Sequence, residues 1–163
     1  MIEKIINGIN YRLDEETKTA EVIKRREGIY NDYGDEIIIP ETVVLNDVTY
    51  RVTRIGEKAF SCCESLKSIT IPNSVKSIGE RAFFVCSSLT AIKVAKGNTV
   101  YDSRKNCNAL IHTATNTLIR GCQNTIIPDS VTSIGKEAFD SCKSLKSIII
   151  PDSVTSVGDE AFC

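Results

Sequence analysis

Several residues on which enzymes and metal sites commonly depend are scarce in this sequence. Tryptophan is absent, His112 is the only histidine, and no Gly-rich phosphate-binding loop occurs. A catalytic triad would depend entirely on His112, which has no nucleophile motif near it. Cys107 and Cys122 flank His112, but this spacing matches no common zinc pattern and a fourth ligand is missing. The sequence therefore predicts no catalytic residues, no metal ligands and no cofactor, with enzymatic activity through His112 as the alternative.

The sequence also lacks an excess of either charge. Its 20 Lys and Arg residues are balanced by 21 Asp and Glu residues, for a formal net charge of -1. This balance supplies no broad positive field for a phosphate backbone or an anionic membrane, so no nucleic-acid partner is predicted. The run Lys24-Arg25-Arg26 is flanked by Glu21 and Glu27 and is interpreted as a solvated hairpin edge.

Long apolar runs are missing as well. No stretch approaches the roughly 18 apolar residues of a membrane-spanning helix, and the first residues lack the apolar segment of an export signal. We therefore predict no membrane span. The missing signal keeps a cytoplasmic location open, although a chain whose signal had been removed would look the same.

What the sequence does contain is a repeat with a period of 23 residues. Its fullest copy reads Leu66-x-x-Ile69-x-Ile71-Pro72-x-Ser74-Val75-x-x-Ile78-Gly79-x-x-Ala82-Phe83-x-x-Cys86. Another long copy begins at Leu145, and partial copies lie before and between the two. A unit this short cannot bury its apolar residues alone, so the copies are expected to stack into one continuous core.

Each repeat predicts a short strand, a stop and a helical turn. The alternation Ile69-x-Ile71 favours a strand, which Pro72 ends because proline has no N–H donor. The glycine that follows permits a sharp turn, and Ala-Phe-x-x-Cys has the spacing of one helical turn. The phenylalanines that recur at one repeat position are expected to form an aromatic column in the core: Phe60, Phe83, Phe139 and Phe162. The cysteines that recur at another position are expected to pack there as buried thiols: Cys63, Cys86 and Cys142. No disulfide is predicted, and the oxidation state of the other cysteines stays open: Cys62, Cys107, Cys122 and Cys163.

The repeat divides the chain into two parts. Residues 1–34 alternate as a β-hairpin and are expected to cap the first repeat, with Asn31-Asp32-Tyr33-Gly34 as the connecting turn. Residues 35–163 form the repeat array, in which Asn46-Asp47 marks an inserted hairpin. Val94 and Ile127 are 33 residues apart instead of 23, which predicts a hairpin-bearing unit near residues 98–122. The last copy stops inside a unit, so the array is expected to be incomplete at its C-terminus.

These motifs resemble the BspA-like, or treponemal-type, leucine-rich repeats. The resemblance covers roughly residues 35–163, where Ile-Gly-x-x-Ala-Phe occurs three times and Val-Gly-x-x-Ala-Phe once. Ala95, Asn98, Cys122 and Thr125 depart from the family pattern. The resemblance implies an α+β fold, a right-handed solenoid with short concave parallel strands, short helical turns and β-hairpin insertions. It also implies a non-enzymatic module of a cell-surface or secreted protein that adheres to host matrix proteins or to other cells.

Positions between the buried strand residues point out of the strand ladder and are the candidates for binding a protein partner. They combine isoleucines with cationic and polar side chains: Ile38, Lys67, Thr70, Lys93, Gln123, Ile126, Lys146 and Ile149. Five of them are expected to form one outward row along the concave face: Ile38, Thr70, Lys93, Ile126 and Ile149. Val154 and Phe162 are candidates for an interface between two copies of the chain at the uncapped C-terminal end. The favoured function is protein recognition or adhesion through the concave sheet face. The alternative is an intracellular or self-associating structural scaffold, which the many apparently free cysteines favour.

Overall fold

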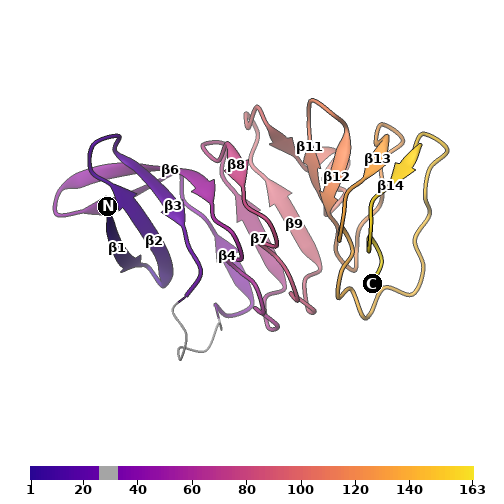
Figure 1. Cartoon of the computed structure of the whole chain (residues 1–163), viewed down its shortest axis with the longest axis horizontal. Coiled ribbons are helices and arrows are strands. Elements are labelled where there is room, and N and C mark those ends of the chain that lie inside the picture. The colour runs from indigo at the N-terminus through magenta and orange to yellow at the C-terminus, as the bar shows by residue number, and fades with distance from the viewer. Residues whose placement is uncertain (26–32) are drawn as a thin grey trace.

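The computed structural model describes residues 1–25 and 33–163. The molecule is elongated, and its strands succeed one another from the N-terminal to the C-terminal end of the long axis (Figure 1). Arg26, Asn31 and Asp32, which belong to the predicted hairpin edge and connecting turn, lie outside the described residues. We divide the repeat region into five units by the position of Leu66: unit one (35–65), unit two (66–88), unit three (89–121), unit four (122–144) and unit five (145–163).

The N-terminal strands pair in antiparallel order and then join the repeats. They are β1 (Ile2–Ile6), β2 (Ile9–Asp14) and β3 (Thr19–Val22). Strand β3 pairs in parallel with β6 (Val48–Ile55), so the N-terminal sheet continues directly into unit one. Strand β5 (Thr42–Leu45) forms the expected hairpin with β6. Its turn residues Asn46 and Asp47 both have positive φ (51° and 62°), as a tight hairpin requires.

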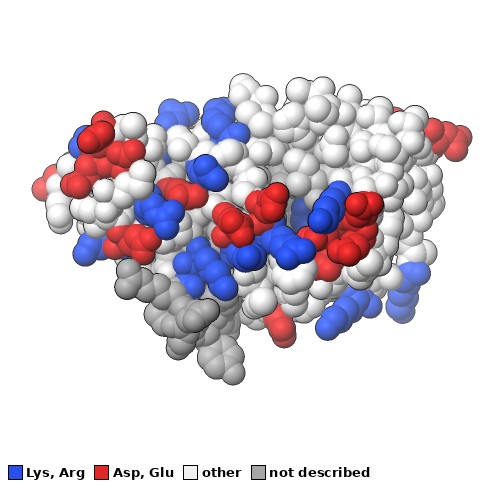
Figure 2. Space-filling model, viewed as in Figure 1, with Lys and Arg blue, Asp and Glu red and all other residues white. Residues whose placement is uncertain are grey.

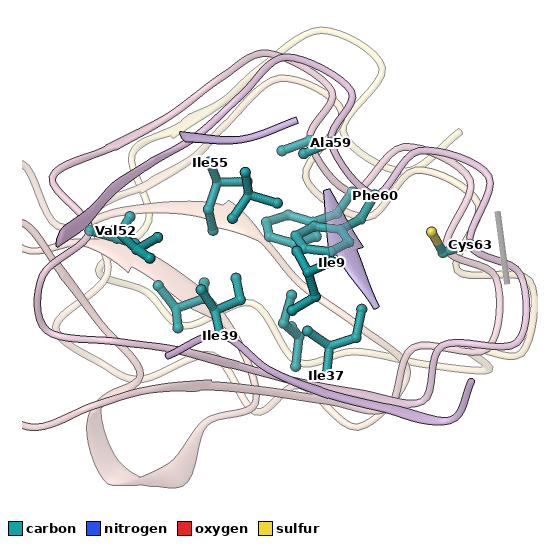
Figure 3. Close-up of a cluster of buried hydrophobic side chains, with 14 of the residues drawn as sticks. Ile9, Ile37, Ile39, Val52, Ile55, Ala59, Phe60 and Cys63 are labelled. Carbon is teal, nitrogen blue, oxygen red and sulfur yellow. The ribbon is translucent and has the colours of Figure 1, made fainter. Parts of the chain in front are cut away.

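A parallel three-stranded sheet contains the first strand of units one to three. Its strands are β4 (Glu36–Ile38), β7 (Ser68–Ile71) and β9 (Ala91–Val94). Ile37, Ile69 and Ile92 lie in register and are 4%, 0% and 1% exposed. Figure 3 shows how Ile37 and Ile39 meet side chains of β6 around Phe60. The alternation of buried and outward residues predicted from the sequence is therefore present in these strands.

Further short strands form a second set of parallel contacts. In units one and two, β6 pairs with β8 (Ser77–Ile78). The other sheet has the order β10 (Tyr101–Asp102), β11 (Leu110–His112), β12 (Thr117–Arg120), β13 (Ser133–Ile134) and β14 (Ser156–Val157). Strands β11 and β12 are antiparallel, so the hairpin expected within 98–122 is present. A single 3₁₀ turn, η1 (Arg104–Asn106), precedes it.

The predicted helical turns, and with them the α+β class, are wrong. In residues 1–25 and 33–163 there is no α-helix. Two residues in each Gly-x-x-Ala-Phe-x-x-Cys segment have positive φ, which no α-helix accommodates: Lys58 (53°), Cys62 (62°), Arg81 (52°), Val85 (55°), Glu137 (55°) and Ser141 (56°). The N–H groups of four of them, Lys58, Cys62, Glu137 and Ser141, donate to carbonyls of the next unit instead of continuing a helix.

The repeat glycine is also required for a reason other than the predicted one. Gly79 does not have positive φ, but a Cβ at this position would collide with the backbone of Glu57 in the preceding unit. A Cβ on Gly158 would meet Lys136 in the same way. The glycine therefore permits close stacking of two units.

The phenylalanines form two stacked pairs instead of one continuous column. The rings of Phe60 and Phe83 lie 5.8 Å apart at 4°, and those of Phe139 and Phe162 lie 5.0 Å apart at 5°. Unit three has no phenylalanine at this position. The core is divided into two clusters, one that runs mainly from the N-terminal strands through units one to three and one that runs from unit three through units four and five.

All seven cysteines are free. Cys63 and Cys86 are buried, as expected of a packed repeat position, and Cys142 is half-buried. Burial raises the pKa of Cys86 to about 11, while its thiol donates to the carbonyl of Phe60 at 3.2 Å. Cys107 and Cys122 are buried as well, whereas Cys62 and Cys163 are exposed.

Candidate protein-interaction face

The outward positions of β4, β7 and β9 form one row across the three-stranded sheet. Ile38 is opposite Thr70, and Thr70 is opposite Lys93. Ile38 is 64% exposed, Lys93 is exposed and Thr70 is half-buried. We call these residues, together with Ser68 and Lys67 beside them, the ladder face. It brings together the first three outward positions that the sequence analysis placed in one row.

The row does not continue as a regular strand into units four and five. Ile126 and Ile149 are 75% and 86% exposed, but neither lies in a strand. The N–H of Ile126 donates to Cys107 of the hairpin-bearing unit at 3.0 Å. Thr125 binds the same unit, because its hydroxyl donates to the carbonyl of Asn108 at 2.7 Å. The segment that would have extended the three-stranded sheet is therefore hydrogen-bonded to the residues just before β11.

The remaining candidates occupy different surroundings. Gln123 is half-buried and its amide donates to the carbonyl of Ser87 at 2.6 Å, which links units two and four. Lys146 is exposed, as is Ile149. Lys67 pairs with Asp35 at 2.7 Å, and both side chains are more than half exposed. Asp35 was not among the predicted site residues, although an acidic residue at the start of the first strand was the available signal.

Unit five exposes apolar residues whose counterparts in unit two are buried. Ile150 and Phe162 are 44% and 45% exposed, whereas Ile71 and Phe83 are 0% and 4% exposed. A hollow of about 370 Å³ lies among Phe139, Leu145, Ile148 and Phe162. Val154 is half-buried and packs against the second core cluster, so Phe162 is the more accessible of the two predicted interface residues.

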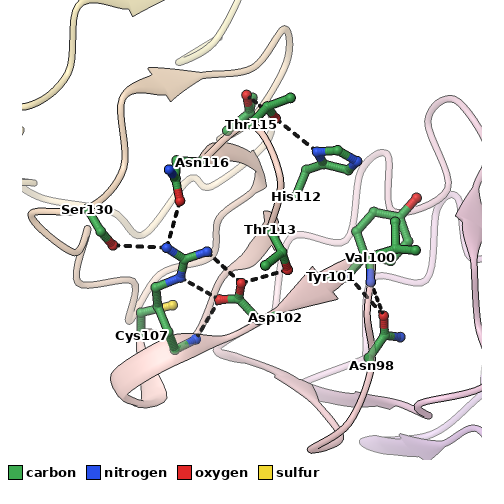
Figure 4. A network of polar contacts seen from close by, with 12 residues as sticks. Asn98, Val100, Tyr101, Asp102, Cys107, His112, Thr113, Thr115, Asn116 and Ser130 are labelled. Carbon is green, nitrogen blue, oxygen red and sulfur yellow. Dashed lines mark hydrogen bonds and ion pairs between the residues drawn. The ribbon is translucent and has the colours of Figure 1, made fainter.

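The region around His112 is organised by structural contacts (Figure 4). The His112 Nδ1 lies 2.9 Å from the Thr115 hydroxyl, and its ring meets the edge of Tyr101. The thiols of Cys107 and Cys122 donate to backbone carbonyls of Ala109 and Asn108. Within the described ranges, no three His, Cys, Asp or Glu side chains are grouped so as to hold a metal ion.

An ion-pair network beside His112 ties the hairpin-bearing unit together. Arg104 donates to both carboxylate oxygens of Asp102 at 2.7 and 2.6 Å, and also to Asn116 and Ser130. Thr113 donates to Asp102 as well. Burial raises the pKa of Asp102, but the hydrogen bonds from Arg104 and Thr113 outweigh it and leave that pKa below its ordinary value. The network joins β10, the β11–β12 hairpin and unit four.

Charged side chains of both signs are interspersed on the face of the molecule shown in Figure 2. This agrees with the formal net charge of -1. No helix in the described part of the chain has the length and apolar character needed to cross a membrane.

Known proteins with similar sequences and structures identify the family of this architecture. Residues 41–123 and 119–163 match the BspA type leucine-rich repeat region, with six copies. A leucine-rich repeat protein from Bacteroides ovatus is 33% identical, with a TM-score of 0.54, over 98% of this chain and 32% of its own. Another, from Bacteroides capillosus, is 27% identical with a TM-score of 0.53, over 95% and 86% of the two chains. A third, from Eubacterium ventriosum, is 16% identical with a TM-score of 0.53, over 96% of this chain and 61% of its own. At this identity the likeness shows the fold alone.

This chain thus spans about a third of the length of the Bacteroides ovatus protein. None of the curated proteins compared with it matches in sequence. Leucine-rich repeat proteins generally bind proteins and generally have no enzymatic activity. The matched repeats and the stacked parallel strands lead to one assignment: this chain belongs to the BspA-type leucine-rich repeat family.

Proposed function

We propose that this chain is a non-enzymatic protein-recognition or adhesion module that binds a protein partner through the ladder face and the exposed isoleucines beyond it. The observation that carries the proposal is the exposure of Ile38, Ile126 and Ile149, each more than 60% accessible at an outward repeat position. Apolar side chains interspersed with lysines are typical of surfaces that bind other proteins.

The partner is proposed to be a host matrix protein or a protein on another cell, and the chain is proposed to act at the cell surface or after secretion. The resemblance to BspA-like surface proteins supports both proposals. Protease treatment of intact cells that make the full protein tests its location. Digestion of this region without lysis supports surface exposure, whereas protection until lysis contradicts it.

Binding of the purified chain to a panel of immobilised extracellular-matrix proteins tests the recognition function. We expect Ile38→Glu combined with Ile126→Glu to weaken binding about tenfold or more, because central apolar contacts dominate such interfaces. Ile5→Glu is the matched control, since Ile5 is 58% exposed on β1, away from the ladder face. Equal weakening by the control would contradict a role for this face.

A self-associating scaffold is the second proposal, and the apolar surface of unit five favours it. Exposed Ile150 and Phe162, with the hollow beside Phe139, form an area on which an equivalent surface of a second copy could pack. In this proposal Val154 supports the surface from beneath, and the chain forms a homodimer. An intracellular setting suits it as well, because the cysteines are free.

A further inference from the structure

A cleft of about 580 Å³ lies between the turn of unit two and the turn of unit four. Its walls include Arg81–Phe84 on one side and Lys136 and Glu137 on the other, with Ile119 and Arg120 of β12 between them. This is the position that the Ala-Phe turn of unit three would occupy. The β11–β12 hairpin replaces that turn and fills only part of the space.

The turns of neighbouring units are normally joined by three hydrogen bonds. The N–H groups of Lys58, Phe60 and Cys62 donate to the carbonyls of Glu80, Ala82 and Phe84 at 3.0, 2.8 and 2.8 Å. The same pattern joins units four and five, where Glu137, Phe139 and Ser141 donate to Asp159, Ala161 and Cys163 at 3.0, 2.7 and 3.0 Å. In both cases the donors face the unit that follows.

The corresponding donors of unit two have no such partner. They are the N–H groups of Arg81, Phe83 and Val85, which take part in no hydrogen bond with residues 1–25 or 33–163. Arg81 and Phe83 line the cleft, and by the register of the repeat the N–H of Val85 points the same way. Arg81 and Val85 also have positive φ, and free N–H groups beside such residues form concavities that bind anions and carbonyl oxygens.

Arg120 adds a buried positive charge to the same cleft. It is only 5% exposed, and its guanidinium donates to the carbonyls of Glu137 at 3.2 Å and Asp140 at 2.8 Å. Its Nε is buried without a hydrogen-bond partner, and no described carboxylate forms an ion pair with it. The nearby carboxylate of Glu137 is paired with Arg81 at 2.7 Å. Arg120 therefore has no direct ion pair of its own, and a ligand carboxylate beside it would be stabilised.

We propose that this cleft binds a short, extended peptide segment that carries a carboxylate. The peptide carbonyls accept the N–H groups of Arg81, Phe83 and Val85, in place of the missing turn. The carboxylate, from a chain terminus or an acidic side chain, interacts with Arg120. This second site does not depend on the ladder face, so either proposal can fail alone.

The test is a titration of the ¹⁵N-labelled full chain, followed by amide resonances in NMR. The probes are acetyl-tetra-alanine with a free terminal carboxylate, the same peptide as its amide, and an acetylated tetrapeptide amide with one glutamate. We expect saturable shifts at Arg81, Phe83 and Val85 with a carboxylate-bearing probe. Lys58, Phe60 and Cys62 are internal controls, because their N–H groups are already bonded. The two acidic probes distinguish a terminal from a side-chain carboxylate.

Two variants test the charge and the space separately. Arg120→Gln is expected to weaken binding of the acidic probe about tenfold. Ile119→Trp is expected to abolish binding by filling the cleft while keeping Arg120, and Ile5→Trp is its control. Absence of shifts at millimolar probe, equal binding of the neutral amide, or unchanged binding in Ile119→Trp would overturn the proposal. The wild-type titration decides the matter even if Arg120→Gln does not fold.

Discussion

Val85 lies in the left-handed region of backbone space, with φ of 55°. A β-branched side chain is unfavourable there, because its Cβ substituents crowd the backbone. The repeat places Val85 at this position because the turn needs two such residues, Arg81 and Val85, to aim their N–H groups toward the next unit. The equivalent residues Cys62 and Ser141 also have positive φ, so the conformation belongs to the repeat turn and not to the preference of valine.

Replacing Val85 with asparagine is expected to stabilise the chain by about 1 kcal/mol, since asparagine tolerates this conformation better. Urea unfolding followed by circular dichroism measures the change. Val94→Asn is the control, because Val94 is half-buried in β9 without positive φ and should lose stability. A loss of stability in both variants would show that packing of Val85 matters more than its backbone strain.

At the scale of elements, the hairpin-bearing unit is held by a polar network instead of a phenylalanine. Asp102 accepts from Arg104 and Thr113, and Arg104 reaches Ser130 of unit four at 3.1 Å. Asn98 contributes at the other end, because its amide donates to the carbonyls of Pro72 and Val75. These bonds join unit three to both neighbours where the aromatic stack is interrupted.

Arg104→Ala is expected to lower the free energy of unfolding by about 2 kcal/mol at neutral pH, because it removes charge-assisted hydrogen bonds from a partly buried network. The pKa of Asp102 is lowered in the folded chain. Its stabilisation is therefore complete above its ordinary pKa and is lost as the pH falls through the lowered one. The difference from wild type should shrink in acid.

Urea unfolding of both proteins across the acid range measures this convergence. Lys96→Ala is the control, because Lys96 is exposed and lies outside the network. A difference between Arg104→Ala and wild type that stayed constant on acidification would argue against the ion pair with Asp102 as its source.

Sequence reasoning predicted the elements better than their local conformations. The period, the strands around Ile69 and Ile92, and both hairpins follow from hydrophobic alternation and turn residues. The type of turn does not follow from the sequence, because the spacing of Ala82, Phe83 and Cys86 fits either a helical turn or the observed turn with positive φ. Backbone bonds between units decide between them, and these form only on stacking.

The candidate site was likewise predicted only in part from the sequence. Ile38, Thr70 and Lys93 were placed in one row because their strands share a register with the repeat. The departure at Ile126 depends on hydrogen bonds from Thr125 and Ile126 to Asn108 and Cys107, just before β11, which a repeat pattern does not reveal. The cleft at Arg120 was missed as well, although the replacement of one turn was visible as ten additional residues.

At the scale of the whole molecule, unit five exposes apolar side chains at repeat positions that are buried in the core of unit two. In unit two, Phe83 is 4% exposed, stacked on Phe60 and in contact with the rest of the first cluster. Phe162 stacks on Phe139 on one side and is 45% exposed. Burying this surface in a dimer would remove apolar area from water, which is the main favourable term in association.

The proposed homodimer therefore predicts that Phe162→Glu shifts the chain to a monomer, because a charge cannot be buried there without a partner. Light scattering with and without reductant measures the mass and separates packing from cross-linking through exposed Cys163. Phe162→Leu is the control, since it keeps an apolar side chain and should still associate. Circular dichroism must show that the glutamate variant is folded. A wild-type monomer, or an unchanged mass in folded Phe162→Glu, would exclude this surface as the dimer interface and favour recognition through the ladder face.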